Sequence, residues 1–104
     1  MAKFTGNRYL TVGVQNEIPL PLQILMWSLI DKNIKKGLEM DYLQVFELKE
    51  ILINGEAYQD IIHSQEVPKR VHKVATNLSS PPIIAKIFVI DSEDYVTMLL
   101  SSEY

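Results

Sequence analysis

The tetrapeptide His63-Ser64-Gln65-Glu66 contains residue types that could do hydrolytic chemistry, with a serine nucleophile and a histidine base. It lies in a β-forming segment, and successive residues of a strand point to opposite faces of a sheet. His63 and Ser64 therefore cannot hydrogen-bond as a catalytic pair, and Glu66 is expected to be a polar strand-end group. A small hydrolase built on His63 and Glu66 is the weakest of three functional hypotheses, and we predict no catalytic residue.

Metal binding is the second chemistry that these residue types suggest. The two histidines, His63 and His72, have no spacing that would set them beside carboxylates on one face. The acidic turn at residues 91–94 lacks the spaced ligands and the glycine of a calcium loop. The chain has no cysteine, which excludes thiolate ligands and disulfides. We predict no metal and no cofactor.

Two groups of basic residues could attract phosphate: Lys32, Lys35 and Lys36, and Lys69, Arg70 and Lys73. The first lies at the end of a predicted helix, where positive charge complements the helix dipole without any ligand. The second lacks the interleaved aromatic residues of a base-stacking surface. The net charge of −3 supplies no general attraction to nucleic acid. A nucleic-acid-associated accessory protein is therefore the second hypothesis, behind a protein-binding role.

The bulk composition is that of a soluble globular domain. The chain has 104 residues, of which 47% are hydrophobic and 22% are charged, enough for one core without disulfide staples. Residues 1–7 carry no apolar signal segment, and no apolar run approaches the ~20 residues of a membrane span. We predict a single domain over residues 1–104, a cytoplasmic location and no membrane partner.

The polar residues are positioned by a predicted hairpin. Residues 43–52 and 57–66 flank Asn54-Gly55, a pair that tolerates the positive φ angles of a type I′ turn. This turn sets a register in which paired residue numbers sum to 109, so that Lys49 faces Asp60. One face then carries Phe46, Leu48, Leu52, Ile61 and His63. The pairing with Phe46 makes His63 a structural, hydrogen-bonded imidazole.

A helix over residues 22–36 is the predicted centre of the fold. Pro21 suits its first position, and Gly37 can end it in the left-handed conformation. Its apolar residues spread over roughly 200°, about twice the arc that a flat sheet covers. We therefore expect a curved sheet around the helix. Ile24 and Trp27 lie near the polar rim and form an exposed apolar spot unless the sheet or the Phe4 segment covers them.

Strands are also predicted at residues 8–14, 70–75, 83–90 and 95–100. The segment 83–90 is apolar apart from Lys86, which is typical of a central strand covered on both faces. Residues 1–7 are expected to be a loose segment, with Phe4 docking on the body. The prediction is an α+β fold with one central helix packed against a curved, largely antiparallel sheet of about six strands, in the order β-α-β-β-β-β-β.

Several sequence blocks occur in a characteristic order: Arg8-Tyr9 to Gly13-Val14, Glu17-Ile18-Pro19 with Leu22-Gln23 and Trp27, residues 41–48, His63–Glu66 with Pro68, residues 85–91, Asp94-Tyr95, residues 97–100, and Glu103-Tyr104. Together they resemble the domain of unknown function 960 family of small Gram-positive bacterial proteins. Ser92-Glu93 stands where that pattern has a glycine, and Lys69-Arg70 where it has an aromatic residue. The resemblance implies a cytoplasmic bacterial accessory protein, and it implies no activity, cofactor or catalytic residue.

The favoured hypothesis is a non-enzymatic protein-interaction or regulatory module that binds another protein, with a homodimer through the Trp27 region or a sheet edge as one form. The polar residues shared with the family pattern suggest that the hairpin displays a recognition surface. The predicted interaction surface comprises Ile24, Trp27, Gln44, Glu47, Gln65 and Glu66. The basic patch of the alternative hypothesis comprises Lys69, Arg70 and Lys73.

Overall fold

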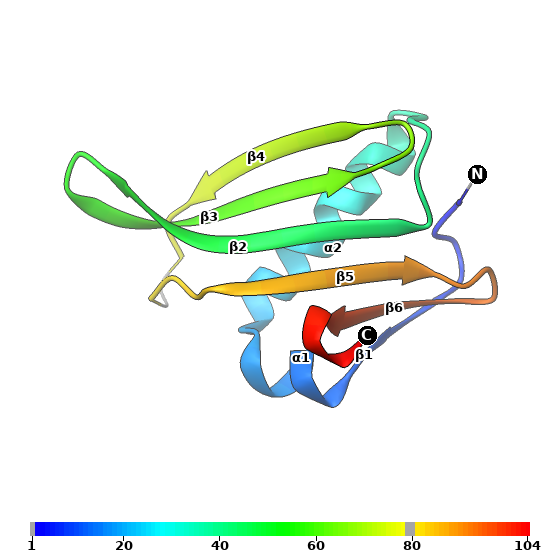
Figure 1. Ribbon diagram of the computed structural model, residues 1–104, viewed down its shortest axis with the longest axis horizontal. Coiled ribbons are helices and arrows are strands. Elements are labelled where there is room, and N and C mark those ends of the chain that lie inside the picture. The colour runs from blue at the N-terminus through cyan, green and yellow to red at the C-terminus, as the bar shows by residue number, and fades with distance from the viewer. Residues whose placement is uncertain (1, 79–80) are drawn as a thin grey trace.

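A computed structural model describes residues 2–78 and 81–104 and arranges them in two layers, a six-stranded sheet with one long helix behind it (Figure 1). The elements in chain order are β1 (Asn7–Leu10), α1 (Val12–Glu17), α2 (Leu20–Lys35), β2 (Leu43–Ile53), β3 (Glu56–Gln65), β4 (Arg70–Thr76), β5 (Ala85–Asp91), β6 (Tyr95–Leu100) and the 3₁₀ turn η1 (Ser101–Glu103). The predicted α+β class is confirmed.

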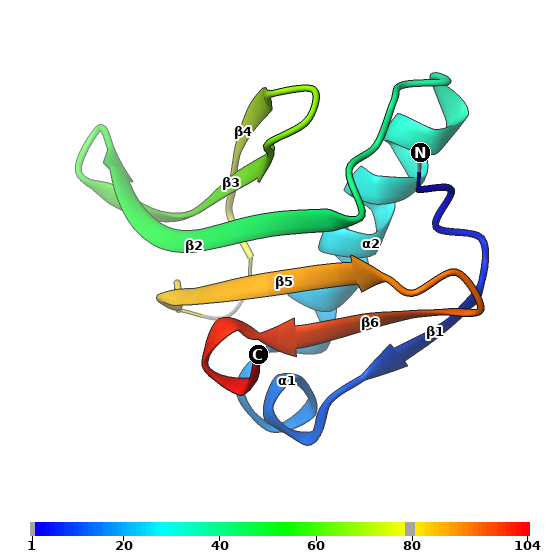
Figure 2. The same ribbon diagram turned by 45° about the vertical axis from the view of Figure 1, so that its right-hand side comes forward.

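The strands follow the order β1-β6-β5-β2-β3-β4 across the sheet. Every neighbouring pair is antiparallel except β1–β6, which is parallel. The β2–β3 ribbon twists away from the body of the sheet and ends in a projecting tip (Figure 2). A largely antiparallel, curved sheet was predicted, whereas the parallel pairing of the first strand with the last was not.

The β2–β3 hairpin has the predicted register. Lys49 pairs with Asp60, and Phe46 pairs with His63. Asn54 and Gly55 have φ angles of 52° and 83°, the left-handed values that a type I′ turn requires. Leu52, which was assigned to the inner face, is 66% exposed because the ribbon tip extends beyond the helix.

Helix α2 packs its apolar strip against the inner face of the sheet. It begins at Leu20, so that Pro21, the predicted first residue, is its second. It ends at Lys35, and Gly37 has the predicted left-handed φ of 71°. Its buried residues meet strand residues from both halves of the sheet, and the fully buried core includes Leu22, Met26, Ile30, Phe46, Leu48, Ile61, Ile87, Val89 and Met98.

The expectation of a loose N-terminal segment is wrong. Phe4 is 2% exposed and belongs to the core, as its predicted docking required. The backbone N–H groups of Lys3 and Phe4 donate to Oδ2 of Asp91 at 3.1 and 3.0 Å, and that of Ala2 donates to the carbonyl of Met40. These bonds fasten Lys3 and Phe4 to the end of β5, and Ala2 to the segment that precedes β2.

The predicted strand over residues 8–14 is also wrong in its second half. β1 ends at Leu10, and Thr11 caps the short helix α1 through its Oγ1, which accepts from the N–H of Val14 at 3.3 Å. Gly13 lies inside this helix, where an added Cβ would approach Oε2 of Glu103 to 2.7 Å. Residues 8–14 favour a strand by local propensity, and the cap and the packing of Val14 against the core override it.

Strand β5 occupies the predicted central position, but only one of its faces is covered by a helix. Ile87 and Val89 are fully buried, whereas Phe88 and Ile90 on the opposite face are half-buried. The apolar run at residues 83–90 therefore does not mark a strand covered on both faces. It leaves apolar side chains on the outer surface of the sheet.

Candidate functional site

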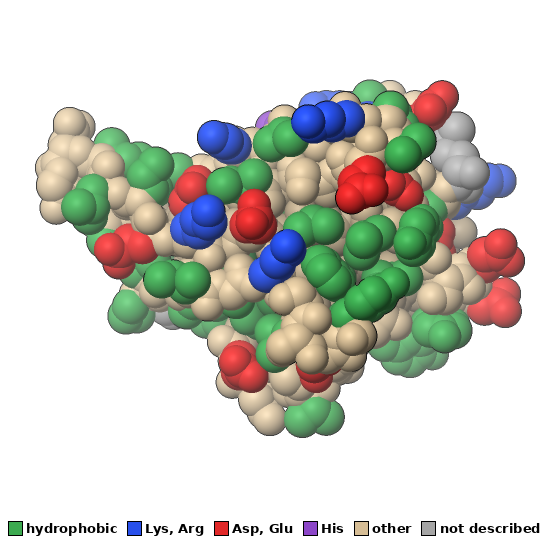
Figure 3. Space-filling view, in the orientation of Figure 1, with side chains coloured by type: hydrophobic (Ala, Val, Ile, Leu, Met, Phe, Trp, Pro, Cys, Tyr) green, Lys and Arg blue, Asp and Glu red, His purple; other side chains and the backbone are tan. Residues whose placement is uncertain are grey.

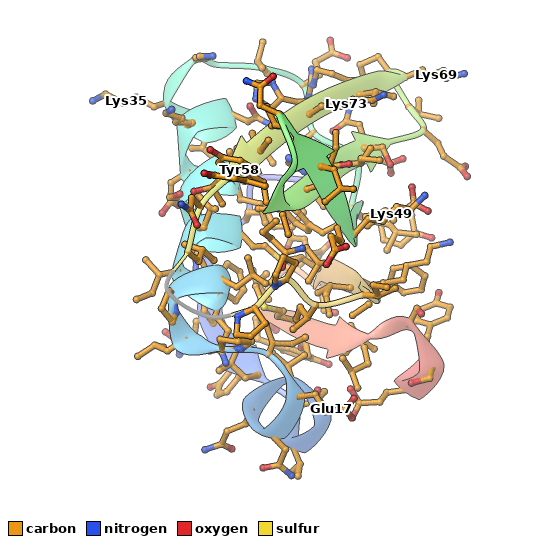
Figure 4. The ribbon with its side chains drawn as sticks, turned by 90° about the vertical axis from the view of Figure 1, so that its left-hand side faces the viewer. Glu17, Lys35, Lys49, Tyr58, Lys69 and Lys73 are labelled. Atoms are coloured by element: carbon orange, nitrogen blue, oxygen red, sulfur yellow. The ribbon has the colours of Figure 1, made fainter. Side chains whose placement is uncertain are left out.

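The outer surface of the sheet is the largest candidate site, because α2 covers only the inner surface (Figures 1 and 4). Side chains alternate along each strand, so residues between the buried positions point outward. We call this surface the open face and define it by Leu43, Val45, Glu47, Ile62, Ser64, Val71, Lys73, Lys86, Phe88 and Ile90.

The centre of the open face is apolar. Val45 on β2 pairs with Phe88 on β5, and Ser64 of β3 lies between Val45 and Val71 of β4. The Phe88 ring also contacts Tyr104 edge-on, with ring centroids 5.4 Å apart. Hydrophobic side chains gather over this part of the sheet in Figure 3. An antiparallel sheet that faces water on one side normally carries polar residues there, so this composition calls for a cover.

A row of charged residues crosses the same face. Glu47 lies between Lys86 of β5 and Ile62 of β3, and Lys73 of β4 follows Ile62. Glu47 is thus half-buried on the open face, as its place in the predicted surface requires. The alternating charges give the face a polarity that a partner can match.

The open face is hollowed near the ends of β2 and β3 by a groove of about 540 Å³. Leu43, Val45 and Val71 contribute apolar walls, and Glu66 and Lys69 contribute exposed charges. Two residues assigned from sequence to different sites, Glu66 and Lys69, therefore line one groove. The full lining is Asp41, Tyr42, Leu43, Val45, Glu47, Ser64, Gln65, Glu66, Lys69, Val71 and Lys86.

Two other residues of the predicted interaction surface lie in the interior instead. Gln44 is 1% exposed and Gln65 is 5% exposed, so their assignment to a displayed surface is wrong. The parity of the strands could have revealed this, because Gln44 alternates with Phe46, and Gln65 alternates with His63. We call Gln44, His63, Gln65 and Arg70 the amide cluster.

Hydrogen bonds fix the orientation of every side chain in the amide cluster. Gln65 Nε2 donates to the carbonyls of Pro68 and Glu39 at 2.7 and 3.2 Å. Its Oε1 therefore accepts from Gln44 Nε2 at 2.9 Å and from Arg70 at 3.1 Å. Because Gln44 Nε2 is a donor, Gln44 Oε1 faces Nε2 of His63, 2.7 Å away. His63 consequently carries its proton on Nε2.

His63 is buried and hydrogen-bonded, as predicted. Its ring stacks on Phe46 with centroids 4.2 Å apart and planes 15° apart. Burial, together with the smaller effects of the neighbouring His72 and Arg70, lowers the pKa of His63 from 6.5 to about 4. At neutral pH the Nδ1 atom is therefore an unprotonated acceptor.

A second, smaller hollow adjoins the amide cluster between β4 and the end of α2. This basic cavity has a volume of about 110 Å³. Its ionisable lining residues are Lys36, His63, Arg70 and His72, with no carboxylate among the described residues that line it. It joins members of both predicted basic groups, because the end of α2 lies against β4. The complete lining is Asn33, Lys36, Leu38, Gln44, His63, Ser64, Gln65, Arg70, Val71 and His72.

The comparisons with known proteins agree with the fold. The profile of a family described as "Staphylococcal protein of unknown function (DUF960)" matches residues 7–103. The chain belongs to this DUF960 family. The crystal structure of a protein of unknown function from Enterococcus faecalis is similar to it, with 26% sequence identity, coverage of 100% of this chain and 97% of that one, and a TM-score of 0.80. No curated protein matches the chain.

The helix side of the DUF960 protein carries the remaining predicted surface residues. Ile24 is 58% exposed on α2, whereas Trp27 is half-buried against the core. The guanidinium of Arg8 on β1 lies 4.8 Å from the centre of the Trp27 ring and pairs with Asp31. Trp27 is thus partly covered by an ion pair of the same chain, and Ile24 is exposed one turn after the exposed Leu20.

The DUF960 fold does not assemble a hydrolytic group from the tetrapeptide. His63 points into the core, Ser64 lies on the open face, and Glu66 is exposed. Across residues 2–78 and 81–104, no three His, Cys, Asp or Glu side chains are grouped so that they could hold a metal ion. Over the same residues, neither helix has both the length and the apolarity to span a membrane.

Proposed function

We propose that this DUF960 protein is a non-enzymatic module that binds another protein through the open face of its sheet. The observation that carries the proposal is the apolar centre of that face, with Val45, Phe88 and Val71 on the side of the sheet that α2 does not cover. The expected partner presents an apolar surface of its own, flanked by charges that complement the Lys86–Glu47 row.

The distribution of chemistry over the two surfaces supports binding over catalysis. His63 has its Nε2 bonded to Gln44 and its ring stacked on Phe46, so it has the environment of a structural residue. Ser64 points to the opposite face of β3 from that imidazole, and Glu66 is exposed beyond the end of the strand. A nucleophile and a base that face opposite sides of one sheet cannot exchange a proton.

Two apolar residues of nearly equal exposure provide a matched test. Val71 lies on the open face and is 53% exposed, and Ile24 lies on α2 and is 58% exposed. The tagged protein, Val71→Glu and Ile24→Glu would each be used to capture partners from a Gram-positive lysate, after circular dichroism confirms that all three fold. We expect one protein, identified by mass spectrometry, to be retained by the wild type and Ile24→Glu and lost by Val71→Glu.

The opposite result would mean that the binding site lies on the helix side of the protein. Loss of the captured protein in Ile24→Glu, with retention in Val71→Glu, contradicts the open face as the site. Light scattering on the purified protein tests one further possibility, that the partner is a second copy of the same chain. A mass of two chains that falls to one in Val71→Glu would identify the partner as a copy and keep the open face as its site.

A nucleic-acid role is the second candidate, favoured by the position of the basic residues. Lys35 of α2 and Lys69 and Lys73 of the β4 region lie toward the same end of the molecule (Figure 4). That end includes the basic cavity, which Lys36 and Arg70 line together. If this role is correct, retention on DNA or RNA falls steeply with salt, and nuclease removes the captured partners.

A further inference from the structure

The basic cavity has features of a binding site for a small anion that are independent of the open face. Its lining joins the end of α2 to β3 and β4, so it belongs to the inner side of the sheet. Three cationic or titratable groups, from Lys36, Arg70 and His72, meet there without a carboxylate among the lining residues. The protein has a net charge of −3, but the charge that lines this cavity is positive, which favours the binding of anions.

Arg70 is held in place for such a ligand. One of its terminal nitrogens, NH2, donates to the carbonyl of Glu39 at 2.5 Å and to Gln65 Oε1 at 3.1 Å. Within residues 2–78 and 81–104, its other guanidinium nitrogens have no hydrogen-bond partner. A guanidinium that is anchored by one nitrogen and free at the others can bind an oxyanion with little further loss of side-chain entropy.

His63 supplies a hydrogen-bond acceptor, which can distinguish one anion from another. Its Nε2 proton is used by Gln44, and its Nδ1 has no hydrogen-bond partner among the described residues. Every side-chain nitrogen or oxygen in these residues that is sealed from solvent does have a partner. Nδ1 is therefore accessible, although His63 is only 5% exposed, and the cavity that His63 lines is the opening available to it.

The combination of cations with one acceptor selects among anions. An acceptor repels the oxygens of a fully ionised anion, and it binds an anion that still carries a hydroxyl proton. Monohydrogen phosphate has such a proton, whereas sulfate at neutral pH has none. A volume of about 110 Å³ suits an anion of this size and is well below the ~300 Å³ or more of pockets for larger ligands.

We propose that the basic cavity binds inorganic phosphate, whose charged oxygens interact with Lys36, Arg70 and His72 and whose P–O–H group donates to Nδ1 of His63. The Nε2–H tautomer that the amide cluster imposes is what leaves Nδ1 free for this bond. The amide cluster thus determines the selectivity of the site as well as the packing of the core.

The test is a titration of the ¹⁵N-labelled full chain at pH 7.5, followed by ¹H–¹⁵N NMR. Sodium phosphate and sodium sulfate are added at equal ionic strength, with sodium chloride making up the difference. We expect saturable shifts at the amides of His63, Arg70 and His72 with phosphate. The dissociation constant for phosphate should be at least about tenfold lower than that for sulfate, because sulfate leaves the Nδ1 acceptor unpaired.

Neighbouring lysines provide the control for charge. Lys36 lines the cavity, whereas Lys35 projects from the side of α2 away from the sheet (Figure 4). Lys36→Gln should weaken phosphate binding about tenfold, and Lys35→Gln, which removes the same charge from the same helix end, should change it less than twofold. Both positions are exposed, so both variants are expected to fold.

Three results would overturn the proposal. Shifts that grow linearly with phosphate, without saturation, would mean that there is no site. Equal dissociation constants for phosphate and sulfate would remove the role of His63 Nδ1. Equal weakening by Lys35→Gln and Lys36→Gln would indicate general screening of the basic end. None of these results depends on whether a protein binds the open face.

Discussion

The two faces of the β2–β3 ribbon use the same strands in opposite ways. On the inner face, each side-chain nitrogen or oxygen sealed from solvent has a hydrogen-bond partner, within the part of the chain that the structure describes. On the open face, apolar side chains such as Val71 remain in contact with water. The inner face thus encloses a few hydrogen-bonded polar residues within its apolar core, whereas the open face leaves some apolar residues exposed.

Two phenylalanines give the largest expected contrast between the faces. Phe46 on β2 is fully buried, and Phe88 on β5 is half-buried on the open face. Phe46→Ala should lower the free energy of unfolding by about 3–5 kcal/mol, through lost burial and the cavity left behind. Phe88→Ala should lower it by less than half as much, measured by urea denaturation. Equal losses would mean that the open face is part of the core.

The next contrast compares neighbouring residues of the predicted recognition surface. Gln65→Ala removes bonds to Gln44, Arg70 and three backbone groups, and it should lower the free energy of unfolding by about 3 kcal/mol. Glu66→Ala, at an exposed position, should change it by less than about 0.5 kcal/mol. Chemical denaturation of both variants measures the difference. A small effect of Gln65→Ala would show that the amide cluster does not stabilise the fold.

The pH dependence of stability should report the same cluster. The pKa of His63 is about 4 in the folded protein and 6.5 in the unfolded chain. Between these pH values the unfolded chain therefore binds a proton that the folded chain does not. The contribution of neutral His63 to the free energy of unfolding is about 3 kcal/mol. It is fully present above pH 6.5 and is lost as the pH falls to 4. Denaturation at several pH values measures the slope. His72→Gln should reduce it only in part, because burial is the largest cause of the lowered pKa and His72 a smaller one. An NMR titration that gives the His63 imidazole a pKa near 6.5 would contradict this prediction.

The smallest expected effect lies on the open face. Glu47 is the cross-strand neighbour of Lys86, and Glu47→Gln should lower the free energy of unfolding by no more than about 0.5 kcal/mol, because the attraction between charges that are not buried is screened by solvent. Denaturation at low and high salt measures this, with the difference from wild type vanishing at high salt. A loss of several kcal/mol would mean that the charged row is structural and not reserved for a partner.

The sequence determined the hairpin and the long helix in recognisable ways. Asn54-Gly55 set the turn and with it the whole β2–β3 register, and Pro21 and Gly37 marked the ends of α2 to within two residues. It did not reveal α1, because the first residues of that helix, Val12 to Val14, continue the strand-like pattern that begins at Arg8. Nor could it reveal the β1–β6 pairing, which depends on where distant segments meet.

The candidate site was less predictable for a related reason. Gln44 and Gln65 are polar by type, and only their strand parity with Phe46 and His63 indicates that they point inward. The basic cavity draws on Lys36 and Arg70, which are far apart in the sequence and meet because α2 ends beside β4. Composition and spacing describe each residue singly, whereas these sites arise from packing.

β1 is the first strand to leave the ribosome and it pairs with β6, the last. Phe4 likewise has its place in the core only when its N–H can meet the carboxylate of Asp91. During synthesis, part of the apolar inner surface of α1, α2 and β2–β5 therefore stays uncovered until β6 can pair with β1. Such non-local closure is slow compared with hairpin formation. The sheet can be completed only after residues 95–100 have emerged, so part of the apolar inner surface of the nascent chain is exposed to proteases and chaperones until then.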